Sequence, residues 1–244
     1  MRQAHREQGK VWFQSARTLP ASPPRLPTGC NSLDSLLGGG IKQGFITEFY
    51  GEPSTGKTQI ALKLCSSAVL SGFGALIVDS EGTFSPSRLR QMAPQGLGDR
   101  VVEETLCISN PARQPEALLH VLDDYARLRN GCLIAVDTLS GLVRQSYPPR
   151  ERLLHVLSQT LRSLGSIAKF RRCFVCVFSG VRWRNTTESD AWPCSAYIAQ
   201  FRVELSIGGG GIRRAVLVKS QDSEPLEALF RIGENGPVDT VEPQ

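Results

Sequence analysis

The chain lacks any apolar stretch long enough to span a bilayer, and its first ten residues are polar and charged without a signal-peptide-type segment. We therefore expect no membrane association and a cytoplasmic location, or a nuclear one if the source is eukaryotic. The sequence also shows no internal repeats. At 244 residues and 41% hydrophobic content, it predicts a single domain with a short extension.

The cysteines show no pattern of paired disulfides. The seven cysteines are odd in number and lie in apolar runs such as Cys132-Leu133-Ile134, which is typical of small core residues in a reducing compartment. Cys173 and Cys176 have CxxC spacing, but there is no second pair. This argues against a metal or redox site.

No strong excess of either charge is present. The chain carries 28 Lys and Arg residues against 23 Asp and Glu, which gives a formal charge of +5. Such a mild excess suits a polyanionic partner, but solubility alone accounts for it equally well. Charge therefore leaves the function class open.

Residues 1–27 are predicted to form an arm rather than a folded domain. They contain one apolar cluster at 11–13 and a proline-rich run from Pro20 to Pro27, which is incompatible with a regular helix. The folded core is expected to span residues 28–244.

The core alternates apolar runs with helical patterns. Expected strands are Phe45–Tyr50, Ala75–Asp79, Val101–Ile108, Leu133–Val136 and Phe174–Phe178, and expected helices are Gly56–Leu70, Ser85–Met92, Pro115–Leu128 and Leu153–Phe170. Apolar strands without alternation, separated by helices, predict a mostly parallel sheet covered on both faces. After about Ala199, the alternating strands Phe201–Ser206, Arg213–Val218 and Glu227–Ile232 predict an antiparallel extension at the sheet edge.

A glycine-rich loop lies between the first strand and helix of the core. Its residues fit the P-loop pattern in full: Gly51, Glu52, Pro53, Ser54, Thr55, Gly56, Lys57 and Thr58. Glycines let backbone N–H groups turn towards phosphate oxygens, and the following helix N-terminus adds its positive end. Lys57 is expected to bridge the β- and γ-phosphates of ATP and Thr58 to ligate Mg²⁺. The alternative is a chance glycine-rich turn.

Two carboxylates follow buried strands. Asp137 ends an apolar strand, where a P-loop enzyme places the Asp that holds the Mg²⁺ shell. Glu81 follows the strand after the P-loop helix and is our candidate general base for positioning the attacking water. Without further support, the acidic turn at 79–81 is equally compatible with an ordinary surface turn.

Several segments together resemble the RecA/RadA recombinase superfamily, most closely its strand-exchange recombinases and their shorter paralogues. They are Thr28-Gly29, Leu33-Asp34-Ser-Leu-Leu37, Gly39-Gly40-Ile41, Thr47-Glu48, the P-loop through Gln59, and Asp79-Ser-Glu-Gly-Thr-Phe-Ser-Pro86. The resemblance spans about residues 28–235. Clock-type ATPases of the same fold share the start of this region but usually carry two adjacent glutamates where this chain has Ser80-Glu81.

The resemblance implies an α/β fold with a RecA-like P-loop NTPase core, a mostly parallel sheet flanked by helices, and an antiparallel C-terminal extension. It also implies that Glu81 is catalytic together with Lys57, that Asp137 is linked to Mg²⁺, and that Arg88 packs on the adenine. Gln59, at the end of the P-loop segment, is a further candidate for nucleotide binding. The chain looks most like the RadB-type paralogues of archaea. It is expected to lack the helical N-terminal domain and to have a short first DNA-binding loop.

One departure from the family pattern concerns the strand after the long helix. In the family this strand ends in an Asn-Gln pair, whose Gln senses the γ-phosphate and relays it to the second DNA-binding loop. This chain has Ser179-Gly180 there. ATP turnover is therefore expected to be weakly coupled to DNA, and full strand exchange is not expected.

The family position of loop two, 181–193, identifies candidate DNA contacts. Arg182 and Arg184 flank Trp183, so they could bind phosphates while the ring stacks on a base. Further candidates, Arg144, Arg150 and Arg152, belong to the shortened first loop. The alternative is an ordinary solvated loop. Arg213-Arg214 on the terminal hairpin are interpreted as a solvated edge that deters strand pairing.

Phe13-Gln-Ser-Ala16 resembles the Phe-x-x-Ala oligomerisation motif that recombinases place before the core. There the Phe fills a pocket on a neighbouring subunit and the Ala a smaller one. The alternative is that this segment packs on its own subunit.

We therefore expect a protein that binds ATP·Mg²⁺ and single-stranded DNA in homologous recombination and repair. Its predicted role is that of an accessory ATPase with weak activity beside a RadA-type recombinase. The alternatives are a full strand-exchange recombinase, a non-hydrolysing scaffold shaped by ATP, and a clock-type signalling ATPase.

Overall fold

The computed structural model describes residues 22–109, 115–129, 131–144, 150–182, 185–220 and 226–240. The strands are β1 (Arg25–Leu26), β2 (Ile41–Lys42), β3 (Ile46–Gly51), β4 (Gly74–Asp79), β5 (Thr105–Ser109), β6 (Cys132–Asp137), β7 (Phe174–Ser179), β8 (Val181–Arg182), β9 (Asn185–Ser189), β10 (Phe201–Ile207), β11 (Ile212–Lys219), β12 (Leu226–Gly233) and β13 (Gly236–Asp239). The helices are α1 (Asn31–Leu36), α2 (Lys57–Leu70), α3 (Pro86–Met92), α4 (Gly98–Glu104), α5 (Pro115–Leu128), α6 (Leu139–Arg144), α7 (Arg150–Arg171), α8 (Cys194–Ile198) and a 3₁₀ turn at Gly209–Gly211.

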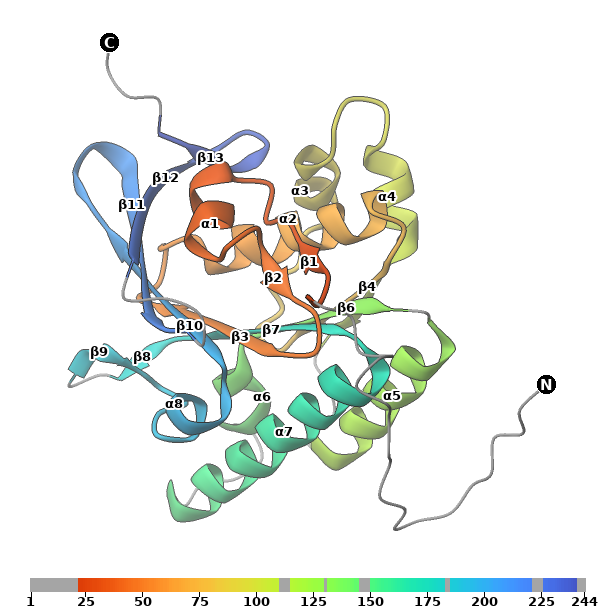
Figure 1. The fold of residues 1–244 in the computed structure, drawn as a ribbon, viewed down its shortest axis with the longest axis vertical. Coiled ribbons are helices and arrows are strands. Elements are labelled where there is room, and N and C mark those ends of the chain that lie inside the picture. The colour runs from red at the N-terminus through yellow and green to blue at the C-terminus, as the bar shows by residue number, and fades with distance from the viewer. Residues whose placement is uncertain are drawn as a thin grey trace.

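A nine-stranded sheet forms the middle layer, in the order β13-β12-β11-β10-β3-β7-β6-β4-β5 (Figure 1). The six strands from β10 to β5 are parallel to one another, and β11, β12 and β13 continue the sheet antiparallel. The predicted α/β class and the antiparallel C-terminal extension are both confirmed. In β3, β4, β6 and β7 every residue is buried, which explains the continuous apolar runs of β4, β6 and β7. In β3 the run is interrupted by Thr47 and Glu48.

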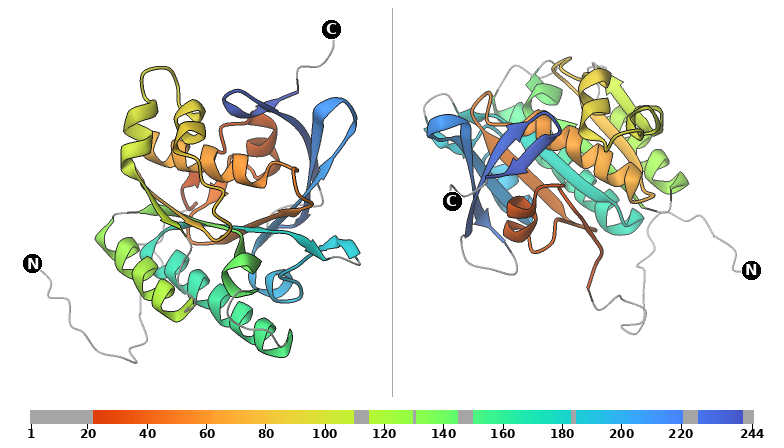
Figure 2. Two further views of the ribbon diagram at one scale, coloured as in Figure 1. Left: turned by 180° about the vertical axis from the view of Figure 1, so that it is seen from behind. Right: turned by 90° about the horizontal axis from the view of Figure 1, so that it is seen from above.

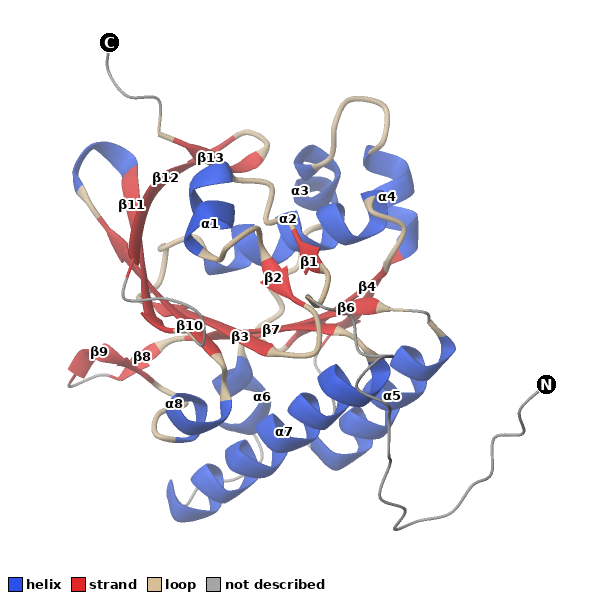
Figure 3. Ribbon diagram, viewed as in Figure 1, coloured by secondary structure: helices blue, strands red, loops and turns tan. Residues whose placement is uncertain are grey.

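Helices cover both faces of the sheet and create two apolar cores (Figure 2). One core joins the sheet to α1, α2, α3 and α4, and the other joins it to α5, α6, α7 and α8. The long helix α7 buries Leu157, Leu161 and Leu164, at the helical spacing that predicted it. The sheet appears edge-on between these two helical layers in Figure 3.

The segment from Val101 to Ile108 is the main error in the predicted elements. Its first four residues belong to helix α4, and the strand begins only at Thr105. Val101 is buried in the core, while Arg100 and Glu104 form an exposed i,i+4 ion pair. One buried face and an ion-paired turn stabilise a helix here, which outweighs the strand preference of two adjacent valines.

The structure has a short strand before residue 28, the predicted start of the folded core. Strand β1 pairs antiparallel with β2, and Arg25 Nη1 donates a hydrogen bond to the Gly40 carbonyl at 3.3 Å. Within the described ranges, no helix is both long and apolar enough to span a membrane.

Asp239, at the end of β13, caps helix α1 from the far end of the chain. Helix α1 has no hydrogen-bonding side chain at its own N-cap, Cys30. Asp239 Oδ1 instead accepts hydrogen bonds from the Ser32 backbone N–H at 2.7 Å and from the Ser32 hydroxyl. Partial burial raises the pKa of Asp239, but these hydrogen bonds outweigh it and lower the pKa to about 2.

Replacing Asp239 with Ala is expected to lower the free energy of unfolding by about 1 kcal/mol at neutral pH, as for loss of a helix N-cap. Because the folded-state pKa of Asp239 is lower than the roughly 3.9 of an unfolded Asp, its contribution is complete above about pH 4 and is lost as the pH falls towards 2. Thermal unfolding of wild type and variant at pH 7 and pH 3 measures both effects. Asp239→Asn keeps the acceptor oxygen, so its free energy of unfolding at pH 7 should fall less than that of Asp239→Ala. Equal stability of wild type and Asp239→Ala at pH 7 contradicts the cap.

Candidate nucleotide site

A cavity of about 960 Å³ lies at the carboxyl ends of the parallel strands. Its walls come from the glycine-rich loop, from the ends of β4, β6 and β7, and from the C-terminal extension: Glu52, Pro53, Ser54, Gly56, Lys57, Thr58, Gln59, Glu81, Arg88, Asp137, Thr138, Ser140, Gly180, Val181, Asp190, Arg213 and Ile232. Ligands bind at this edge in open α/β sheets. Most of the predicted nucleotide-site residues therefore line one cavity.

Two glycines allow the loop to form. Gly51 lies so close to β10 that a Cβ there would be 2.3 Å from the Leu205 carbonyl oxygen. Gly56, just before α2, has φ of 104°, a left-handed conformation that favours glycine. Thr55 is buried behind the loop and closes its turn by donating to the Glu52 carbonyl at 2.9 Å. The loop therefore leads directly into the N-terminus of α2, whose first N–H groups have no partners within the helix.

Lys57 is held at the mouth of the loop. Its Nζ donates to the carbonyl oxygens of Gly51 at 2.7 Å and Glu52 at 2.8 Å. Burial lowers the pKa of Lys57, while the nearby carboxylate of Asp137 opposes this change. The ammonium group is thus positioned where phosphates would lie against the loop.

Thr58 and Asp137 meet at the floor of the cavity. The Thr58 hydroxyl donates to Asp137 Oδ2 at 2.7 Å. Burial raises the pKa of Asp137 to about 6, although the Thr58 hydrogen bond lowers it. A hydroxyl and a carboxylate are hard oxygen donors of the kind that Mg²⁺ prefers. Thr58 and Asp137 are therefore the residues that would hold Mg²⁺ at this site. The described residues contain no cluster of three or more His, Cys, Asp or Glu suited to a metal ion.

Glu81 and Asp79 have different roles although both lie at the end of β4. Asp79 is buried, and its carboxylate accepts hydrogen bonds from the backbone N–H groups of Thr83 at 3.0 Å and Phe84 at 2.9 Å. It therefore shapes the turn. Glu81 is exposed to the cavity, and its Oε1 accepts a hydrogen bond from Thr138 Oγ1 at 2.8 Å. This geometry leaves its second oxygen available to a water molecule in front of the P-loop.

Arg88 and Gln59 both line the cavity. Arg88 Nε donates to Gln59 Oε1 at 2.7 Å, and Arg88 Nη2 donates to the Gly233 carbonyl at 2.9 Å. Arg88 thus ties α2 and α3 to the β12–β13 hairpin. Its stacking on adenine remains a prediction.

Gly180 stands where the family has its relay amide, and Asp190, from the other end of loop two, lies next to it. Gly180 has no side chain, and a Cβ there would lie 3.0 Å from Asp190 Oδ2. The Asp190 N–H donates to the Gly180 carbonyl at 2.9 Å. Asp190 was not predicted as a site residue, because nothing in the sequence between them indicates that the two ends of this loop meet at the cavity.

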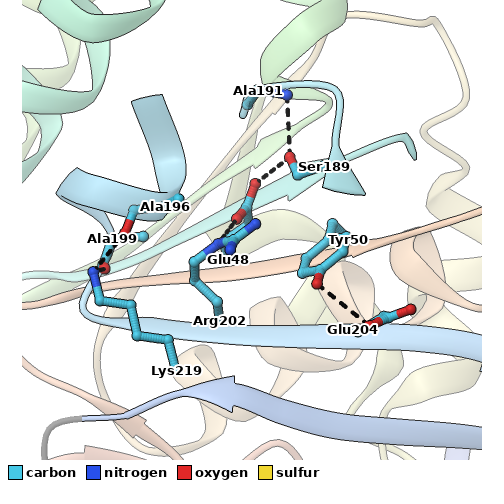
Figure 4. Close-up of polar contacts among 9 residues, drawn as sticks. All are labelled: Glu48, Tyr50, Ser189, Ala191, Ala196, Ala199, Arg202, Glu204 and Lys219. Carbon is cyan, nitrogen blue, oxygen red and sulfur yellow. Dashed lines mark hydrogen bonds and ion pairs between the residues drawn. The ribbon is translucent and has the colours of Figure 1, made fainter. Parts of the chain in front are cut away.

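A buried ionic network anchors the same end of loop two to the sheet (Figure 4). Glu48, on the strand that enters the P-loop, accepts a hydrogen bond from Ser189 Oγ at 2.6 Å and one from Arg202 Nε at 2.7 Å. The Ser189 hydroxyl oxygen also accepts a hydrogen bond from the Ala191 N–H at 3.1 Å. The end of β9 is therefore fixed to β3 and β10 immediately before Asp190.

The predicted DNA contacts lie around two segments that leave neighbouring strands. Arg144 ends α6, which follows β6, and Arg182 lies in β8, which follows β7. Arg150 and Arg152 begin α7, and the Arg152 side chain is exposed. Trp183, Arg184, Phe13 and Ala16 lie outside the described residues. Because β6 and β7 are adjacent and parallel, both segments start at the same edge of the sheet as the cavity.

The family model that matches this chain is described as Rad51, and it aligns with residues 24–240. The chain belongs to the Rad51 family. Among its Rad51-family relatives, the DNA repair and recombination protein RadB of Thermococcus kodakarensis is 34% identical over 224 residues, which cover 86% of this chain and 97% of that protein. The corresponding RadB of Halobacterium salinarum strain R1 is 31% identical over 221 residues, with coverage of 86% and 93%.

A longer relative matches only in part. The DNA repair and recombination protein RadA of Cenarchaeum symbiosum is 29% identical over 238 residues, and the match covers 89% of this chain but 59% of that protein. Among solved structures, the crystal structure of the RadB recombinase superposes with a TM-score of 0.76 at 32% identity, covering 88% of this chain and all of the other. The RecA-like fold and the resemblance to RadB are thereby confirmed.

Proposed function

We propose that this chain binds ATP·Mg²⁺ and single-stranded DNA and acts in homologous recombination and repair as an accessory partner of a RadA-type recombinase. The observation that carries the proposal is the cavity in which Lys57, Thr58, Asp137 and Glu81 converge. These residues supply a phosphate-binding cation, two hard oxygen ligands and a carboxylate for orienting water, which is the set that phosphoryl transfer to water requires.

The accessory role is supported by the replacement of the family's relay amide. Gly180 has no side chain that could sense a γ-phosphate, and Asp190 fills the adjoining space. We therefore propose slow ATP hydrolysis with weak dependence on DNA. The same observation favours a second candidate, a scaffold in which ATP shapes an interface without being hydrolysed.

The DNA-binding part of the proposal rests on the arginines at the two segments beside the cavity edge. Phosphate contacts make affinity depend on salt, roughly in proportion to the number of phosphates neutralised. We also propose that the arm segment Phe13–Ala16 binds a second subunit. A candidate docking strand is β5, which forms one edge of the nine-stranded sheet and carries Leu106, 47% exposed. A cytoplasmic location, or a nuclear one in a eukaryote, is part of this proposal.

The test is binding of a fluorescein-labelled oligo(dT) and of a fluorescent ATP analogue at several salt concentrations. Replacing Arg182 and Arg184 together with Gln is expected to weaken oligo(dT) binding about tenfold or more and to reduce the salt slope by about 1 to 2, because two phosphate contacts are removed. Nucleotide affinity should not change.

The matched control is Arg100→Gln, on helix α4, where the guanidinium pairs with Glu104. It should bind DNA as wild type does. Absence of oligo(dT) binding by the wild type at low salt contradicts the DNA-binding part of the proposal, and absence of binding of the ATP analogue contradicts the nucleotide part.

A further inference from the structure

Strand β11 carries two adjacent arginines that face opposite sides of the sheet. The side chains of a strand alternate, so Arg213 shares a face with Ala215 and Leu217, both of which are buried in the core on the side of the sheet that α2 covers. Arg214 points the other way and is exposed, and its Nε donates to Glu227 Oε2 at 2.9 Å. The interpretation of both residues as a solvated edge therefore fits Arg214 only.

The row of side chains that contains Arg213 runs out of the core into the nucleotide cavity. Arg213 is paired with Phe230 on β12. Phe230 and Ile232 in turn approach the P-loop, since a Cβ at Gly56 would lie 3.0 Å from Ile232 Cδ1 and 3.8 Å from Phe230 Cε2. Arg213 consequently lines the same cavity as Lys57, from the antiparallel extension of the same chain.

The hydrogen bonds of Arg213 are incomplete within the described residues. Its Nη1 donates to the Gly211 carbonyl at 2.6 Å, which fixes the guanidinium beside the glycine turn between β10 and β11. Its Nε is buried and has no acceptor in that part of the chain. A buried N–H of a charged group without an acceptor is destabilising, and native proteins usually pair such groups with a ligand, water or ion.

Cations are in the minority among the charged residues that line the cavity: Lys57, Arg88 and Arg213 lie beside the carboxylates of Glu52, Glu81, Asp137 and Asp190. A polyphosphate therefore depends on each of the three positive groups. Of these cations, Lys57 and Arg88 both donate to backbone carbonyls, and Arg88 additionally donates to Gln59. Arg213 uses one of its five guanidinium N–H groups within the described residues. A guanidinium in a pocket formed by a P-loop also matches the geometry of phosphate oxygens better than an ammonium would.

We propose that Arg213 is an additional nucleotide-binding residue whose guanidinium donates to a polyphosphate oxygen of ATP bound in the same subunit. This inference rests on the proposed ATP site and adds a component to it. The C-terminal extension is then part of the binding site rather than only an edge of the sheet, and one positive charge near the phosphates comes from this chain without a neighbouring subunit.

The experiment measures the dissociation constant of a fluorescent ATP analogue with Mg²⁺, and the rise in Tm caused by ATP, in four variants. Arg213→Gln is expected to weaken binding by about 10- to 100-fold, the loss typical of a hydrogen bond to a charged group. Arg213→Lys should recover part of it, because the charge remains while the Nε–H is lost. Arg214→Gln, one residue away on the other face, should bind as wild type does, and Lys57→Ala should lose binding.

Each outcome has one meaning. Failure of the wild type to bind the analogue overturns the proposed ATP site. Normal wild-type binding with unchanged affinity in Arg213→Gln, whose Tm without ATP matches that of wild type, overturns only the role of Arg213. If Arg213→Gln lowers the Tm without ATP, its loss of binding has a structural explanation, and Arg213→Lys is compared with Arg214→Gln instead. Equal nucleotide affinity of these two variants overturns the inference. At least threefold weaker binding by Arg213→Lys supports it.

Discussion

Replacing Glu81 with Gln is expected to lower the kcat of ATP hydrolysis by about 10²- to 10⁴-fold, the range typical for loss of a general base. The Kd for ATP should change little, because the side-chain hydrogen bond of Glu81 is to Thr138 and not to the proposed phosphate-binding loop. Gln has nearly the same shape and keeps an oxygen that can accept the Thr138 hydrogen bond, so the variant removes mainly the charge. Steady-state phosphate release and equilibrium binding of the same ATP analogue separate the two effects.

The matched control for Glu81 is Glu103→Gln, an exposed glutamate on helix α4 outside the cavity, which should hydrolyse ATP at the wild-type rate. Wild-type turnover by Glu81→Gln would falsify its assignment as the residue that positions water. Loss of ATP binding in Glu81→Gln indicates instead that the glutamate maintains the structure of the cavity. Negligible turnover by the wild type itself, with normal ATP binding, favours the scaffold over the ATPase.

Replacing Glu48 with Ala is expected to lower the free energy of unfolding by about 3–5 kcal/mol, because it leaves a buried charge without its partner. The side chain of Glu48 is fully buried and that of Arg202 is only 10% exposed. Arg202 Nη2 already lacks a hydrogen-bond acceptor in the described part of the chain, so removal of Glu48 would also leave its Nε unpaired. Urea unfolding followed by circular dichroism measures the change.

Glu204→Ala is the matched control for this prediction. Glu204 is on β10 two residues from Arg202 and is partly exposed, and Tyr50 donates to it only at 3.5 Å. Its replacement should cost less than about 1 kcal/mol, as for exposed ion pairs and weak hydrogen bonds. Replacing Glu48 and Arg202 together with apolar residues should recover much of the stability lost in Glu48→Ala. Equal stability of Glu48→Ala and Glu204→Ala is the result that contradicts a contribution from the buried pair.

The Glu48 network has a consequence for loop two. Glu48 lies on β3, which leads into the P-loop, and Ser189 lies at the end of β9 next to Asp190. The C-terminal end of loop two is therefore attached to the strand that carries the nucleotide loop, and Asp190 faces the cavity over Gly180. This attachment provides a direct physical connection between the two segments even though the relay amide is missing.

From the amino-acid sequence alone it was possible to predict the P-loop, the fold class and the positions of Asp137 and Glu81 at strand ends. Each of these depends on local patterns: contiguous residues at fixed spacing, or a carboxylate directly after an apolar strand. Parallel strands expose their carboxyl ends at one edge of a sheet, so the convergence of Lys57, Thr58 and Asp137 followed without knowledge of the strand order. The error at Val101–Glu104 shows the limit of the same reasoning, since burial of one helical face decided against the strand preference of valine.

The polar residues that line the cavity outside these motifs became evident from the tertiary structure. Arg213 and Arg214 are chemically identical neighbours, and they differ because only one face of β11 is turned towards the core. Asp190 reaches the cavity because loop two returns to the end of β7, and Asp239 caps a helix more than 200 residues earlier in the chain. These contacts are long-range, so no local spacing encodes them: they depend on how the sheet and its loops pack.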